Sequence, residues 1–297
     1  MLSNRKSSFL TVLLAGIFCL LGLLAPRAGE AKVACAYDGG GMALSVTVAG
    51  FDEAEVTRFR DEILVSASIG SPIRCAGEEA TITNTERIDV VAKGEGAVWI
   101  SLSGGPFAPG ATQEPDASSE IEFTVAGDGF VDFEGGRGQD HFRFLGSGSE
   151  SGVNLNADDD DDLDVTSPSH PSPSLLLVFE GGPGADLIDA KGRPGLEMFA
   201  AGGKGDDTLV APAAAGAILD GGKGRDRLFG GNRSDFLVPG PGADAVKARS
   251  GSDQVMIGSD RQRDRIDCGA GTDFVGKPDD MDRLLACERV KGRGSRN

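Results

Sequence analysis

The chain repeats a nine-residue pattern of glycines, one aspartate and one large apolar residue, written G-G-x-G-x-D-x-U-x with U as the apolar position. Because side chains alternate along an extended backbone, the U residue points to one face, which predicts a short strand around it. Glycine adopts positive φ without steric cost, so the first six positions predict a tight turn. Units follow one another without insertion at 221–229, 230–238, 239–247 and 248–256. The expected elements are short stacked strands whose U residues form a core.

Looser copies of the unit extend the pattern on both sides of this run. They begin at Gly135, Gly181, Gly202 and Cys268. A two-residue insertion places Asp264 at the sixth position of a further unit, whereas the segment 211–219 has the length of a unit but no carboxylate. The aspartates at the sixth position are Asp140, Asp186, Asp207, Asp226, Asp235, Asp244, Asp253, Asp264 and Asp273.

This pattern resembles the RTX (hemolysin-type) calcium-binding nonapeptide repeat of secreted bacterial proteins. The resemblance implies an all-β fold, a right-handed parallel β-solenoid or calcium-binding β-roll in which two units make one turn. Aspartates about two units apart would then stack in two columns along the roll. One column is Asp186, Asp207, Asp226, Asp244 and Asp264, and the other is Asp235, Asp253 and Asp273. Asp140 is expected to stand alone, outside the uninterrupted stack.

Stacked carboxylates repel one another, which predicts a cation between them. At roughly the strand spacing of 4.8 Å, two bare carboxylates repel by about 3 kcal/mol at an effective dielectric near 20. Ca²⁺ accepts roughly six to eight oxygens and combines carboxylates with backbone carbonyls, which the glycine turns expose. We therefore predict that the eight aspartates of the two columns bind several Ca²⁺ ions. The alternative is that they only cap backbone amides of the turns.

The two ends of the chain predict export. Residues 1–31 read as a signal peptide, with Arg5 and Lys6 before an apolar run and a small-x-small site at its end. An uncleaved anchor is the alternative, and no membrane insertion is expected after cleavage. An even number of cysteines in an oxidising compartment favours disulfides. Three connectivities are open for Cys35, Cys75, Cys268 and Cys287, and the pairs 35–75 and 268–287 would join neighbours at each end.

The remaining segments divide the chain. Residues 32–80, with alternating strands at 43–48 and 62–68, predict an N-terminal cap. Residues 81–180 predict degenerate rungs without calcium turns, interrupted by an acidic, proline-rich loop at 156–174, and the calcium-binding roll follows at 181–276. Residues 277–297 predict a C-terminal cap and a basic tail.

The net charge and the sequence motifs disfavour some classes of function. The formal net charge of −17 argues against a nucleic-acid partner. The chain has neither an HExxH motif nor a GxSxG motif, and we expect no enzyme. The predicted function is a secreted calcium-binding structural or interaction module that folds on binding Ca²⁺, with an extracellular or cell-surface glycan or protein as partner. The alternatives are a glycan-active enzyme, which the single Trp and single Tyr disfavour, and a calcium-dependent export module, although RTX proteins usually lack a signal peptide.

Overall fold

The computed structural model describes residues 32–50, 52–67, 71–105, 121–145, 151–154, 165–167, 176–191 and 197–292. The predicted signal peptide, most of the predicted acidic loop and the last five residues lie outside them. Among the described residues, none belongs to a helix long and apolar enough to cross a membrane.

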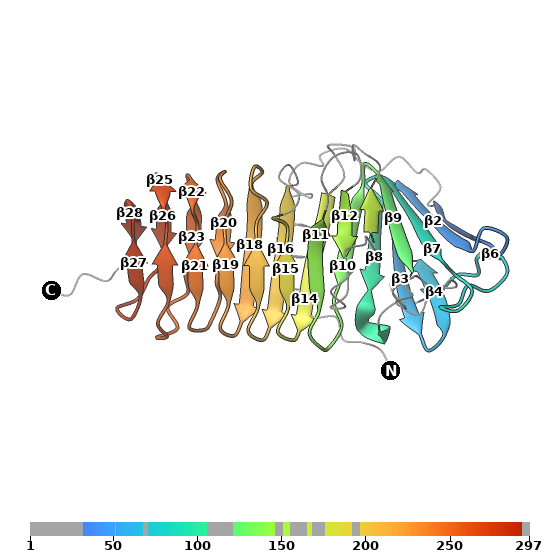
Figure 1. Cartoon of the computed structure of the whole chain (residues 1–297), viewed down its shortest axis with the longest axis horizontal. Coiled ribbons are helices and arrows are strands. Elements are labelled where there is room, and N and C mark those ends of the chain that lie inside the picture. The colour runs from blue at the N-terminus through green and yellow to red at the C-terminus, as the bar shows by residue number, and fades with distance from the viewer. Residues whose placement is uncertain are drawn as a thin grey trace. The chain divides into compact units, whose positions relative to one another are not determined.

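The described chain is all-β, as predicted, and consists of two large sheets of stacked strands (Figure 1). The first sheet has fourteen strands, in the order β27 (Arg283–Leu285), β24 (Arg265–Asp267), β21 (Ala245–Lys247), β19 (Arg227–Phe229), β17 (Thr208–Val210), β15 (Leu187–Asp189), β11 (His141–Leu145), β12 (Ser151–Asn154), β13 (Val165–Ser167), β9 (Glu122–Gly127), β7 (Arg87–Gly94), β2 (Ala43–Gly50), β1 (Lys32–Asp38) and β6 (Ala76–Gly77).

The second sheet has twelve strands, in the order β28 (Arg289–Lys291), β26 (Phe274–Gly276), β23 (Gln254–Met256), β20 (Phe236–Val238), β18 (Ala217–Lys223), β16 (Met198–Lys204), β14 (Leu176–Pro183), β10 (Phe130–Glu134), β8 (Ala97–Ser101), β3 (Glu53–Phe59), β4 (Glu62–Ala67) and β5 (Ser71–Pro72). A two-stranded sheet pairs β22 (Ser250–Gly251) with β25 (Ala270–Gly271), and a 3₁₀ turn, η1, covers Leu102–Gly104.

Parallel pairing between successive rungs makes this a β-solenoid. Strand β19 pairs in parallel with β21 and β21 with β24, while β20 pairs in parallel with β23 and β23 with β26. The three-residue strands from β15 to β26 bury their central residue, which is the U position of the unit, as the repeat pattern predicts, whereas in the last two strands, β27 and β28, the central residue is not buried. Leu228, Leu237, Val246 and Val255 are all buried in the core between the sheets.

The core of the N-terminal rungs is larger and aromatic. Phe123, Phe133, Phe142 and Phe179 are fully buried, and the rings of Phe133 and Phe179 stack with their centroids 5.2 Å apart. Burying a large apolar side chain contributes roughly 1.5–3 kcal/mol. Apolar burial therefore stabilises these rungs more than it stabilises the glycine-rich rungs.

Two segments differ from the expected division. Strands β2 and β3 pair in parallel with β7 and β8, so the parallel stacking begins at residue 43, within the segment predicted as a cap. Antiparallel β1 and β4 flank these strands. Within the predicted loop 156–174, β13 pairs in parallel with β9 and antiparallel with β12, so this part of the segment belongs to the first sheet.

Two disulfides join cysteines near each end of the described chain. Cys35 bonds to Cys75 and Cys268 bonds to Cys287. This is the neighbour pairing among the three connectivities left open by the sequence. Disulfides persist in oxidising compartments, so the two bonds indicate a non-cytoplasmic environment.

Candidate functional site

The aspartates of the repeat form two ladders, one at each edge where the turns enter the strands. In the first ladder, Oδ1 of each aspartate accepts the backbone N–H of the corresponding aspartate in the preceding rung, at 2.8–3.1 Å. In the second ladder, Asp235 caps Ala217 in the same way at 2.8 Å, and the next two aspartates follow. The first ladder consists of Asp140, Asp186, Asp207, Asp226, Asp244, Asp264 and Asp282, and the second of Asp235, Asp253, Asp273 and Glu288.

The order of both predicted columns is the order of these ladders, but three members differ from expectation. Asp140, expected to stand alone, heads the first ladder because its backbone N–H donates to Asp186. Asp282 and Glu288 were not among the predicted site residues. Asp282 follows Asp264 by eighteen residues and precedes an apolar Leu284, so the D-x-U spacing was the signal that could have found it. Glu288 has the same spacing to Val290, with glutamate in place of aspartate.

The glycines of the turn are explained by close contacts with the ladder and with neighbouring rungs. A Cβ on Gly202 would lie 2.4 Å from Oδ2 of Asp207, so this first position of its unit has no room for a side chain. Gly203, at the second position, has φ of 107°, and its Cβ would lie 2.2 Å from the carbonyl oxygen of Gly182. The repeat therefore needs glycine where the turn backbone packs directly on the next rung.

The second oxygen of most ladder aspartates has no partner. These Oδ2 atoms are buried, and none of them has a hydrogen-bond partner among the described residues. Asp235 is an exception, because its Oδ2 accepts the backbone N–H of Gly231 at 2.7 Å. The aspartates with such an orphaned oxygen are Asp186, Asp207, Asp226, Asp244, Asp253, Asp264 and Asp273.

Burial raises the pKa of six of these carboxyl groups, because the charged form loses its hydration; the six belong to Asp186, Asp207, Asp226, Asp244, Asp253 and Asp264. The pKa of Asp226 rises to about 8 and that of Asp264 to about 7, and neighbouring aspartates add to the effect of burial in both cases. The hydrogen bond from a backbone amide lowers the pKa of each group but does not offset burial. Burial likewise raises the pKa of Asp186 to about 7 and of Asp207, Asp244 and Asp253 to about 6.

A buried carboxylate with one orphaned oxygen needs either a proton or a cation. A proton on Oδ2 would remove the charge but leave an O–H donor that also lacks a partner among the described residues. A cation would remove the charge and bond to the oxygen. No group of three or more His, Cys, Asp or Glu side chains in the described part of the chain gathers as a metal site. Ca²⁺ on a ladder would therefore complete its ligand set with backbone carbonyls and water.

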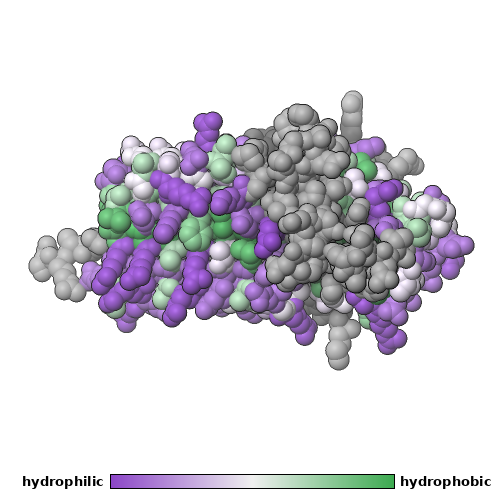
Figure 2. Space-filling model, viewed as in Figure 1, coloured by the Kyte–Doolittle hydropathy of each residue, from purple (hydrophilic) through white to green (hydrophobic). Residues whose placement is uncertain are grey.

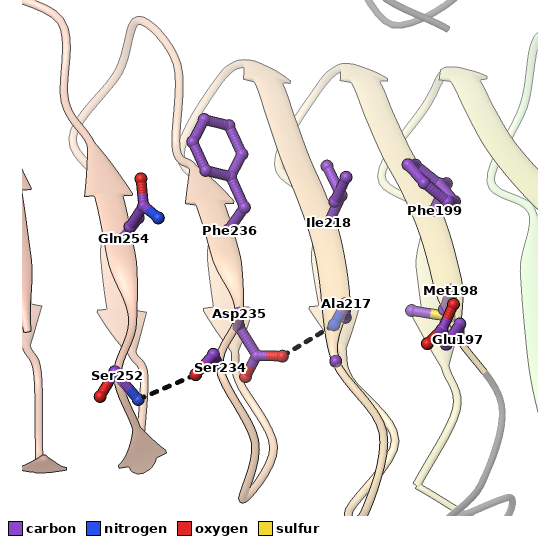
Figure 3. Close-up of a pocket in the computed structure, with 11 residues that line it drawn as sticks. Glu197, Met198, Phe199, Ala217, Ile218, Ser234, Asp235, Phe236, Ser252 and Gln254 are labelled. Carbon is purple, nitrogen blue, oxygen red and sulfur yellow. Dashed lines mark hydrogen bonds between the residues drawn. The ribbon is translucent and has the colours of Figure 1, made fainter. Parts of the chain in front are cut away.

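A groove of about 280 Å³ lies on the outer surface beside the start of the second ladder (Figure 3). Phe199, Ile218 and Phe236 stand in a row along it from the neighbouring strands β16, β18 and β20. Glu197 and Asp235 are the carboxylates among its lining residues. The groove combines an apolar row with a polar edge, which is the usual composition of a small-molecule site.

No protein-family model matches the chain, and no curated protein or solved structure matches it either.

Proposed function

We propose that the chain is a secreted calcium-binding β-roll protein of the RTX type, a structural or interaction module whose C-terminal roll folds on binding several Ca²⁺ ions. The orphaned Oδ2 atoms of the two ladders carry this proposal. Leaving a buried polar group unsatisfied costs roughly 1–3 kcal/mol, and more when it is charged, so a fold that repeats this seven times favours a ligand for these atoms.

The ligand would be held by Asp186, Asp207, Asp226, Asp244 and Asp264 on one edge and by Asp235, Asp253 and Asp273 on the other. Ca²⁺ would supply positive charge and oxygen coordination to the buried carboxylates. Because the ladder assembles only in the folded roll, its binding free energy would be folding free energy. Asp235 is the weakest ligand of the set, since both of its oxygens already accept backbone N–H groups.

The groove supports a binding role over a catalytic one. Glycoside hydrolysis by the usual mechanism needs two accessible carboxylates on either side of the scissile bond. Of the two carboxylates in the groove, Glu197 is exposed, whereas Asp235 is buried with both oxygens engaged. We propose a module without enzymatic activity, with an extracellular glycan or protein as partner.

A calcium titration of the exported chain tests the proposal. Circular dichroism and hydrogen exchange would be followed from excess chelator to millimolar Ca²⁺, with Mg²⁺ as the control cation. We expect residues 202–276 to gain protection with Ca²⁺, while the phenylalanine-rich rungs before residue 134 stay protected throughout. Equal exchange across 202–276 in chelator and in Ca²⁺ would show that the ladders only cap amides.

A further inference from the structure

The outer face of the first sheet has a row of arginines across its C-terminal strands. Arg227 pairs with Ala245, Ala245 with Arg265 and Arg265 with Arg283, so all four residues occupy the same position in successive rungs. The three arginines are exposed. We call Arg227, Arg265 and Arg283 the arginine row. On the face that Figure 2 draws, the C-terminal strands show hydrophilic residues interspersed with hydrophobic ones.

The arginine row forms no ion pair within the described residues. Within the described part of the chain, no ion pair and no side-chain hydrogen bond engages any of its three guanidinium groups. On the same outer face, Lys247 pairs with Asp267 in register and these two charges cancel, so the row remains in excess. Like charges on directly opposed residues destabilise a sheet, and Arg265 and Arg283 are such a pair.

The arginines do not serve the buried ladder either. Each follows a ladder aspartate by one residue, yet the charges that act on the carboxyl groups of Asp226 and Asp264 come from other aspartates. The other face of the roll has no such row, since the equivalent positions in the second sheet are Phe236, Gln254 and Phe274. A cost to sheet stability without an internal benefit is typical of a functional surface.

We infer that the arginine row binds a linear acidic polysaccharide, one whose sugars carry carboxylates. The planar guanidinium of arginine recognises a carboxylate through two parallel hydrogen bonds. Rungs repeat at about 4.8 Å along the stack, a spacing of the order of one sugar unit. A chain laid along the stacking direction would therefore meet Arg227 two rungs before Arg265, and Arg283 one rung after it. An acidic polysaccharide is a narrower class of the glycan partner in the proposed function. The arginine row depends on that proposal in one respect, because the roll must be folded for the row to form.

Charge and shape disfavour a nucleic acid as the occupant. Long-range repulsion by a chain of net charge −17 opposes a densely charged phosphate polymer more than a polysaccharide with one carboxylate per repeat. Single-stranded nucleic acids also stack their bases on aromatic rings. The aromatic ring nearest to Arg227 in the sequence is Phe229, and the Arg249 guanidinium already lies over it, 5.9 Å from the ring centroid.

The test measures binding of the full exported chain to immobilised hyaluronate in Ca²⁺, with neutral dextran as the control polymer and hydrogen exchange as the check that the roll is folded. Hyaluronate is chosen because its carboxylates are regularly spaced along an unbranched chain. The variant is R227Q/R265Q/R283Q, and the matched control is R74Q/K93Q/R137Q, which removes the same charge from exposed positions elsewhere. We expect the row variant to lose affinity about tenfold or more, equivalent to 1.4 kcal/mol, and the control to bind like the wild-type chain.

Each outcome bears on the inference. Equal weakening by both variants would overturn it, because net charge and not the row would then decide binding. Tighter binding to single-stranded DNA than to hyaluronate would overturn the glycan class, and no binding by a folded roll would overturn the site itself. A roll that is folded without Ca²⁺ would contradict the proposed function while leaving this measurement valid.

Discussion

Replacing Asp244 with asparagine should change stability in opposite directions with and without Ca²⁺. Asparagine has nearly the shape of aspartate, and its Oδ1 can still accept the backbone N–H of Asp226, which lies 2.8 Å away in the wild type. The substitution removes only the charge and the orphaned Oδ2. It therefore separates the amide-capping role of the ladder from its proposed role as a calcium ligand.

The magnitude in chelator follows from the carboxyl group itself. Burial raises the pKa of Asp244 from the ordinary value of 3.8 to about 6, with Asp260 and Asp206 adding repulsion. Ionising this group in the fold at pH 8 therefore costs about 3 kcal/mol, at 1.36 kcal/mol for each pH unit between the two values. Without Ca²⁺, D244N should recover up to about this amount, less the cost of a buried amide N–H₂ that lacks a partner.

In Ca²⁺ the change in stability should have the opposite sign, because the variant would lack one of the proposed calcium ligands. An ion present at a hundred times its dissociation constant stabilises the fold by about 2.7 kcal/mol, and most of this should be lost at the mutated turn. Urea unfolding followed by circular dichroism, with hydrogen exchange of 236–256 as the local readout, would be measured at pH 8 in both conditions. D189N is the control, since Asp189 has the same charge but lies on the outer face of β15.

A shift of stability in the same direction in chelator and in Ca²⁺ would contradict the two roles proposed for Asp244. A gain in both conditions would mean that the ladder carboxylates cap amides and bind no ion. D189N should show no such reversal in any case.

Three further predictions concern the ladder, the turn and the cap. The folded-state pKa values of Asp226, Asp244 and Asp264 lie above 3.8, so the stability that these groups contribute in chelator is present below that value and lost as pH rises through about 6 to 8. Chemical denaturation across this range should show the loss, and Ca²⁺ should abolish it. G221A should destabilise the roll by about 1–3 kcal/mol, since its Cβ would lie 2.8 Å from Oδ2 of Asp226, while G138A, whose Cβ meets nothing within 4 Å, should not; a pair of thermal melts would decide this. Removing the Cys268–Cys287 bond, which closes a loop of 19 residues, should cost about 3 kcal/mol and appear as faster exchange of β27 and β28, and an unchanged exchange rate there would contradict it.

Much of the fold could be predicted from residue spacing. A single U residue in each nine fixes which face of a short strand is buried, and Leu228, Leu237, Val246 and Val255 are in the core for that reason. The spacing of the aspartates likewise determined the order of both ladders, since two units make one rung. The two-residue insertion before Asp264 did not disturb this order, because the extra residues are accommodated in the turn.

Weaker signals at the ends of the ladders were missed from the sequence. Asp140 is separated from Asp186 by residues that do not follow the unit, and Glu288 has a longer side chain than the pattern requires. Only the pairing of their rungs brings these residues into the ladders. The same holds for the disulfides, because four cysteines allow three connectivities and the stacking of the end rungs selects one.

The chemistry of the site was decided by tertiary structure. The sequence shows that an aspartate recurs at the position of Asp226 in every second unit. It does not show that Oδ1 of Asp226 accepts a backbone N–H while its Oδ2 is buried without a partner among the described residues. Spacing places Arg227 and Arg265 in one row, since each follows an aspartate of the first column, but only the pairing of β24 with β27 adds Arg283 to it. The repeat determined which residues stack, since backbone periodicity is a local property of the sequence. The packing of rung on rung determined which of their atoms are left without a hydrogen-bond partner, since burial is a property of the whole stack.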